Sequence, residues 1–227
     1  GFDWNSGLKP QRRSWMVSAY TSAHASGASD VKLLRSQTAF NAALVESNYT
    51  KNAVTFIGRN LKHRFPISVG VNVKKRLTDR WGIETGLVYS YLESSGDLDA
   101  EYTYRYKQKI HYLGIPLNLS YSLYQNKRLD IYLQGGGMAE MALSAHGYTR
   151  IFNHGVFASD IDDKLPASGV LWSVGLGAGI SYDFVQNFGL YLEPGANYYF
   201  PNSNQPRSYR TDNPWSFNVR VGFRFKF

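Results

Sequence analysis

Alternation of apolar and polar residues with a period of two runs through most of this 227-residue chain, and it restricts the fold more than any other feature. In the closing stretch WSFNVRVGFRFKF, every second residue is apolar and the residues between are Ser, Asn, Arg, Gly or Lys. This period marks a β-strand with two unlike faces. Eight such segments can be recognised, at 13–23, 66–77, 81–92, 107–123, 128–144, 169–184, 188–200 and 215–227. The sequence therefore predicts an all-β fold.

The links between these segments alternate strictly between short and long. The short links are 78–80, 125–127 and 185–187, and the long ones are 24–65, 94–106, 145–168 and 201–214. Polar residues fill the short links, as expected of tight turns. The alternation predicts an antiparallel up-and-down meander with turns at one end and loops at the other. Residues 1–12 are expected to form an N-terminal extension, and 13–227 a single domain whose long first loop, 24–65, includes a short helix within 30–45.

Three features indicate that the apolar face of the meander points outward into lipid. The segments are 11 to 17 residues long, enough for the roughly 9–11 residues with which a tilted strand crosses a bilayer. The polar face is rich in glycine, as the narrow lumen of an eight-stranded barrel requires. Aromatic residues gather near the ends of the apolar stripes, where lipid headgroups would lie.

An open sheet edge inside a bilayer would leave backbone groups without hydrogen bonds, at several kcal/mol each. The last segment, 215–227, must therefore pair with the first, 13–23. The predicted fold is an eight-stranded antiparallel up-and-down transmembrane β-barrel.

Composition narrows the class of protein further. The chain has no cysteine, which excludes disulfides and thiolate metal sites. The histidines at 63, 111, 146 and 154 lack metal-ligand spacing, so we expect no cofactor and no metal. No apolar run approaches the roughly 20 residues of a membrane helix. The opening residues do not form a signal peptide, so we expect a mature form or a fragment. The net charge of +8 favours an anionic neighbour.

Several motifs resemble those of a known family. The terminal alternation of Val221, Phe223, Phe225 and Phe227 resembles the assembly signal of bacterial outer-membrane proteins. The stretch 111–119, HYLGIPLNL, resembles a strand of the PorT-like outer-membrane barrel domain of Bacteroidetes, a barrel of the OmpA/OmpX type. The stretches GLVYS at 86–90 and GLGAG at 175–179 resemble other strands of that domain.

The resemblance spans about 66–227 and does not include the loop 24–65. It implies residence in the bacterial outer membrane and recognition of the C-terminal strand by the barrel-assembly machinery. It also implies a non-enzymatic surface-binding or structural role, or an accessory role in secretion.

Charged residues on the predicted inner face need partners, because an isolated charge in a narrow lumen is costly. The inner face carries Lys74, Glu84, Asp130, Glu140, Asp183, Glu193, Arg220, Arg224 and Lys226. We expect Arg220 and Arg224 to pair with carboxylates among Glu84, Glu140 and Glu193. Such pairs would plug the barrel; the alternative is a gated ion path or a carboxylate active site.

Cations and tyrosines are interleaved in the segments assigned to the loop end. On an outer-membrane barrel such residues would face the phosphates of lipopolysaccharide rather than nucleic acid. The expected contact residues are Lys62, Arg64, Arg105, Lys107 and Lys109.

Three other functional classes remain as alternatives. A lipid A-modifying enzyme would use His24 and Ser26, which resemble the His-x-Ser of a lipid A deacylase, with Glu46 as a partner. A narrow pore would conduct ions. A soluble ligand carrier of the lipocalin type would have the opposite orientation of faces.

Overall fold

The computed structural model describes residues 14–25, 62–99, 102–165, 167–200, 205 and 208–227. Its strands are β1 (Trp15–Ala25), β2 (Lys62–His63), β3 (Ile67–Arg76), β4 (Trp81–Asp99), β5 (Tyr102–Gln125), β6 (Leu129–Asn153), β7 (Val156–Lys164), β8 (Val170–Val185), β9 (Phe188–Tyr199) and β10 (Trp215–Lys226). One short helix, α3 (Tyr209–Asp212), precedes β10. None of the helical structure in the described ranges could span a bilayer.

Eight strands close into an antiparallel barrel. Around the barrel the order is β4-β3-β1-β10-β9-β8-β6-β5, and β5 pairs with β4 to complete the circle. The first and last strands pair along their length, from Met16 with Lys226 to Ala25 with Phe217. Backbone hydrogen bonds between Trp15 and Phe227 fasten the final residue. The predicted fold class and closure are therefore confirmed.

The orientation of the faces is also as predicted. Outward residues such as Leu117 and Val219 are 58% and 47% exposed, whereas inward residues such as Asn72 and Arg224 are 1% exposed. A barrel in water would bury its apolar residues instead. The soluble-carrier alternative is therefore wrong, because the apolar outer face of this barrel requires a lipid environment.

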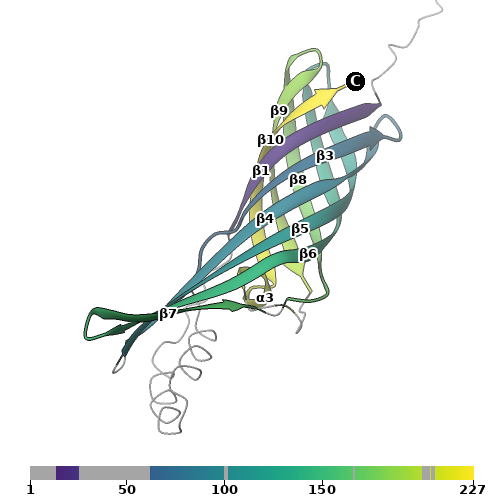
Figure 1. The fold of residues 1–227 in the computed structure, drawn as a ribbon. Coiled ribbons are helices and arrows are strands. Elements are labelled where there is room, and N and C mark those ends of the chain that lie inside the picture. The colour runs from purple at the N-terminus through teal and green to yellow at the C-terminus, as the bar shows by residue number, and fades with distance from the viewer. Residues whose placement is uncertain (1–13, 26–61, 100–101, 166, 201–204, 206–207) are drawn as a thin grey trace, which may run out of the picture.

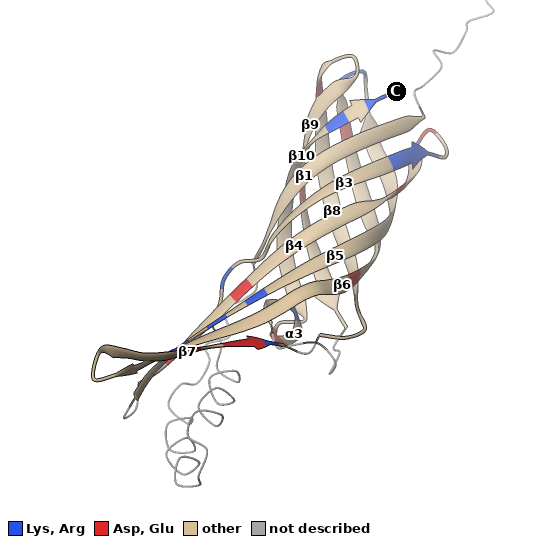
Figure 2. Cartoon of the chain, viewed as in Figure 1, with Lys and Arg blue, Asp and Glu red and all other residues tan. Residues whose placement is uncertain are grey.

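Aromatic side chains form a belt around the barrel at each end of the apolar band. At the turn end Trp81 packs on Tyr121 with ring centroids 4.8 Å apart. At the loop end Trp215 packs on Tyr198 at 5.2 Å, and Tyr91 on His111 at 5.2 Å. Charged residues gather toward the two ends of the ribbon, with few between them (Figure 2). These two aromatic belts suit the two headgroup zones of a bilayer.

Glycines make room for large side chains inside the narrow lumen. Four inward asparagines each lie directly across from a glycine on the neighbouring strand; these pairs are Asn72–Gly86, Asn118–Gly136, Asn197–Gly175 and Asn218–Gly195. A Cβ atom at Gly175 would lie 2.1 Å from Oδ1 of Asn197. The small residues of the inward face are thus the complement of its large polar ones.

Strands β4, β5 and β6 continue well past the barrel, where β7 joins β6 (Figure 1). The sequence assigned 94–106 and 145–168 to loops, but most of these residues form strands. Beyond the barrel one face of β5 and β6 stays covered, but the buried residues there, such as Tyr104, Tyr106 and Thr149, carry hydroxyl groups, and β7 is exposed along nearly its whole length. The apolar alternation that reveals a strand is therefore weaker. The barrel therefore carries a protruding sheet, which we call the extension. The predicted helix at 30–45 lies outside the described residues.

Candidate functional site

The lumen holds a network of buried polar groups near its middle. Nη1 of Arg220 lies 2.9 Å from Oε1 of Glu193, and the hydroxyl of Tyr132 donates to the other oxygen of Glu193 at 2.9 Å. Arg224 donates to the Tyr132 hydroxyl at 3.2 Å. These groups come from β6, β9 and β10, so the network ties together strands on different sides of the barrel.

Glu84 is held by amides instead of by an arginine. Its Oε1 accepts hydrogen bonds from Asn72 Nδ2 at 2.7 Å and from Gln134 Nε2 at 3.3 Å. Arg224, for which the sequence suggested a carboxylate partner, lies over the rings of Tyr132 and Tyr191, at 5.1 and 4.6 Å from their centroids. Near the turn end Lys226 contacts Asp183.

Glu140 has a partner that sequence reasoning missed. The guanidinium of Arg210, from α3, lies 2.5 Å from Glu140 Oε1, and the two side chains are 1% and 0% exposed. Arg210 lies in 201–214, which the sequence assigned to a loop. A signal was available, because the inward face carries five carboxylates and only four cations. Arg210 is the fifth cation, and it balances the charges that the described residues place in the lumen.

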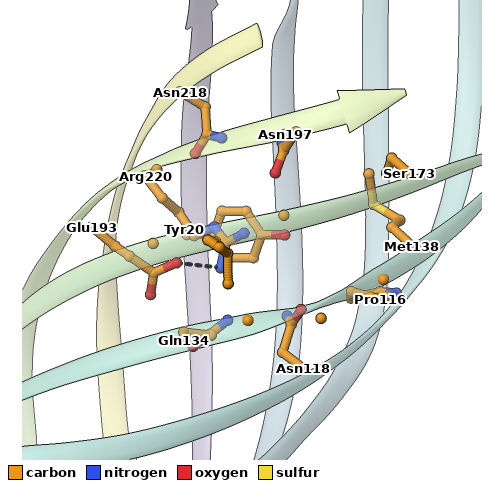
Figure 3. Close-up of a pocket in the computed structure, with 17 residues that line it drawn as sticks. Tyr20, Pro116, Asn118, Gln134, Met138, Ser173, Glu193, Asn197, Asn218 and Arg220 are labelled. Carbon is orange, nitrogen blue, oxygen red and sulfur yellow. Dashed lines mark ion pairs between the residues drawn. The ribbon is translucent and has the colours of Figure 1, made fainter. Parts of the chain in front are cut away.

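A small polar cavity lies beside the Arg220–Glu193 pair (Figure 3). Its volume is about 50 Å³, and the amides of Asn118, Gln134, Asn197 and Asn218 face it. A water molecule needs roughly 10–15 Å³ of such space, so the cavity has room for a few waters and not for a sugar or a lipid.

Five cations predicted for lipopolysaccharide contact lie on the loop side of the loop-end aromatic belt. We call them the outer strip; they are Lys62, Arg64, Arg105, Lys107 and Lys109. Three of them, Arg105, Lys107 and Lys109, project from the outward side of β5; they precede His111 in the sequence and lie on its loop side. Arg105 lies 5.1 Å from the Phe152 ring, and Lys109 lies 5.9 Å from that of Tyr148. A surface hollow of about 750 Å³ opens beside Arg105, Lys107 and Lys109, and three aspartates, Asp97, Asp160 and Asp162, also line it.

Glu93 interrupts the positive charge of the outer strip. Its Oε1 lies 3.1 Å from both Nη1 of Arg64 and Nζ of Lys107, and Tyr91 donates to its Oε2 at 2.8 Å. Burial acts to raise the pKa of Glu93, but the hydrogen bonds from Tyr91 and Lys107 and the charges of Lys107 and Arg64 outweigh it and lower the pKa. Glu93 therefore stays ionised at neutral pH and holds two cations of the strip.

The residues of the enzymatic alternative are not assembled in the described part of the chain. His24 is only 5% exposed and points into the lumen, with Nε2 3.5 Å from Ser22 Oγ. Ser26 and Glu46 lie outside the described residues. Within the described ranges, no group of three or more His, Asp or Glu side chains could hold a metal ion.

Fold and site together define a bacterial outer-membrane β-barrel with a filled lumen. The chain belongs to the outer membrane protein beta-barrel domain family, whose model matches residues 10–204. It therefore resides in the bacterial outer membrane. A search of curated protein sequences found no match.

Solved structures of outer-membrane proteins align with most of this chain at low similarity. Neisserial surface protein A is 15% identical, with 94% of this chain and 97% of that chain covered and a TM-score of 0.45. The attachment invasion locus protein Ail of Yersinia pestis is 10% identical (95% and 99% covered, TM-score 0.44). The outer membrane protein OprG of Pseudomonas aeruginosa is 14% identical (95% and 96% covered, TM-score 0.43). Likeness at this level says nothing about the role of this chain.

Proposed function

We propose that this chain is a sealed, non-enzymatic outer-membrane barrel that holds its extension at the cell surface, where the outer strip binds the phosphates of lipopolysaccharide. The position of the strip carries the proposal. It lies on the outward side of β5, on the loop side of the loop-end aromatic belt. This is the level at which phosphates of the outer leaflet would meet the barrel. Exposed lysines and arginines at such a level attract anionic headgroups.

The filled lumen supports a structural or binding role over a pore. Among the residues that the structure describes, five carboxylates face five cations there, and the cavity beside the Arg220–Glu193 pair is small. Removing any one charge from water is costly, so matched charges hold each other in place. We expect the purified barrel to show no steady single-channel conductance in planar bilayers. Stable channel steps in most insertions would favour the narrow-pore alternative.

We further propose a relationship to the PorT-like barrels of Bacteroidetes and recognition of the terminal strand by the barrel-assembly machinery. The motif at 111–119 and the alternating aromatics ending at Phe227 support these two points. A secretion-accessory role would follow from that relationship. Loss of secreted cargo from a deletion strain, restored by the full chain, would test it.

Neutralising the outer strip is expected to weaken lipopolysaccharide binding strongly. Each cation near an anionic surface contributes about 1 kcal/mol, so the triple change Arg105→Gln, Lys107→Gln and Lys109→Gln should raise the Kd about 100-fold at low salt. Titration of lipopolysaccharide into barrels in detergent, followed by thermophoresis, measures the Kd. The loss should shrink at high salt, because salt screens exposed charges.

The matched control for this triple change removes three exposed cations from the turn end, with Arg80→Gln, Lys127→Gln and Arg128→Gln. It lowers the net charge equally and should leave the Kd nearly unchanged. Equal losses from both triple variants would show that binding follows net charge alone and would contradict a site at the outer strip.

Glu93→Gln is expected to have the opposite effect. The change removes one negative charge and releases Arg64 and Lys107 from their shared partner, while the side chain keeps its shape. Lipopolysaccharide binding should become about fivefold tighter, which corresponds to roughly one surface charge. The same titration measures it. Weaker binding by Glu93→Gln would mean that Glu93 positions the strip for its ligand instead of competing with that ligand.

A further inference from the structure

The short helix α3 carries Arg210 into the outer end of the lumen. The helix lies at the loop end of the barrel (Figure 1), and its Arg210 side chain is 1% exposed. Nη1 of Arg210 lies 2.5 Å from Oε1 of Glu140. Nη2 lies 3.0 Å from Ser90 Oγ and 3.5 Å from Ser68 Oγ. A residue from a loop therefore fills a polar site in the barrel.

Two aromatic rings complete this site. The guanidinium carbon of Arg210 lies 5.0 Å from the centroid of the Tyr199 ring and 5.7 Å from that of Tyr112. We call the surrounding residues the cage; they are Ser68, Ser90, Tyr112, Glu140 and Tyr199. They belong to β3, β4, β5, β6 and β9 respectively. The hydrogen-bonded barrel wall thus builds the cage, and the loop supplies only its occupant.

The chemistry of the cage suits a guanidinium group better than an ammonium group. A guanidinium is planar, donates in several fixed directions and stacks on aromatic faces. Glu140 is fully buried, and its second oxygen, Oε2, makes no hydrogen bond within the described part of the structure. The cage therefore keeps acceptor capacity beyond what Arg210 uses.

Further contacts hold Gln205 and the residues of α3 other than Arg210 against the barrel. Asp212 lies 3.2 Å from His63 Nε2, and the Tyr112 hydroxyl donates to Gln205 Oε1 at 3.0 Å. The Tyr209 side chain packs in an apolar cluster with Leu92 and Ile110. These contacts join α3 to the barrel wall beside the cage, in addition to the contacts of Arg210 within it.

We infer that the cage is a guanidinium-binding site of the outer lumen, filled in cis by Arg210, and that this occupancy keeps α3 closed as a lid. Without Arg210, the Glu140 carboxylate would be buried without a charge partner. Water would then have to enter for the carboxylate to remain ionised. A guanidinium group from outside should occupy the vacated cage and exclude that water again.

A single cysteine can report whether the lid is closed, because the chain contains none of its own. Ser22 is a suitable position, since it is 6% exposed, faces the lumen and pairs with Ser68 in the β1–β3 ladder. The experiment compares labelling by a charged methanethiosulfonate reagent, in nanodiscs, of Ser22→Cys alone and combined with Arg210→Ala. The Arg210→Ala change is expected to speed labelling about tenfold or more.

Methylguanidinium should then slow the labelling of Ser22→Cys/Arg210→Ala back toward the parent rate, whereas methylammonium at equal ionic strength should not. Adding Glu140→Gln, which keeps the shape of the side chain, should abolish this protection. An unheated gel shift confirms that each barrel is folded. If Arg210→Ala destabilises the barrel, methylguanidinium should raise its Tm only when Glu140 is present.

Three results would overturn the inference. Labelling of the Arg210→Ala variant at the parent rate would show that Arg210 does not keep the lid closed. Equal protection by methylammonium would show a nonspecific salt effect. Protection that persists with Glu140→Gln would place guanidinium binding outside the cage.

Discussion

Replacing Gly136 with alanine is expected to destabilise the barrel by about 3 kcal/mol or more, whereas the same change at the adjacent Gly137 is expected to be harmless. A Cβ atom at Gly136 would lie 2.2 Å from the backbone oxygen of Leu117 and 2.4 Å from Oδ1 of Asn118. The backbone oxygen cannot move without disturbing the β5–β6 ladder. At Gly137 the nearest atom is a backbone oxygen at 3.4 Å.

The two positions differ mainly in the face that they occupy, so they form a matched pair. Neither glycine has a positive φ, and alanine can adopt both backbone conformations. Urea unfolding of the barrels in lipid, followed by the unheated gel shift, measures the difference. Gly86→Ala should repeat the loss, since its Cβ atom would lie 2.2 Å from the Val71 oxygen. Equal stability of the Gly136 and Gly137 variants would contradict the account of glycines as room for inward asparagines.

Breaking the Arg220–Glu193 pair from one side is expected to cost about 3 kcal/mol, because it leaves the other charge buried without its partner. The single changes are Arg220→Met and Glu193→Leu. The double change should cost clearly less than the sum of the two, since apolar groups of similar size then replace both charges. Urea unfolding in lipid measures all three variants.

The double-mutant cycle also separates a plug from a loosely hydrated lumen. If waters in the adjacent cavity solvated each charge well, either single change would cost little and the two effects would add. A coupling free energy below about 0.5 kcal/mol between the two changes would therefore contradict the view that matched charges hold the lumen closed.

Sequence reasoning recovered the membrane-spanning part of the fold because lipid imposes a strict pattern there. Each strand has one face in hydrocarbon and one in a crowded lumen, so apolar residues alternate with small or charged ones. The eight strands, their closure and their orientation follow from this pattern. Beyond the barrel the pattern is weaker: the buried residues of β5 and β6 there include Tyr104, Tyr106 and Thr149, which carry hydroxyl groups, and β7, with the sequence VFASDIDDK, is exposed along nearly its whole length and carries no alternation. The sequence therefore does not reveal the extension as strands.

The candidate site was predictable only where its residues lie on strands. The strand period placed Glu84, Glu140, Glu193, Arg220 and Arg224 on the inner face, but it could not assign partners across the lumen. The pairing of Glu140 with Arg210 depends on the path of a connecting segment, and the period of two in the strands gives no information about that path. Counting the inward charges would have shown that one cation was missing, without showing which residue supplies it.

Accessibility of single spin labels along β10 tests the orientation of the barrel most directly. Labels at Phe217, Val219, Val221 and Phe223 are outward, and labels at Ser216 and Asn218 are inward. In nanodiscs, collisions with oxygen, which concentrates in lipid, should rise and fall with a period of two along β10 and be greatest at Val219 and Val221. Higher oxygen accessibility at Ser216 and Asn218 than at Val219 and Val221 would contradict the outward orientation of the apolar face.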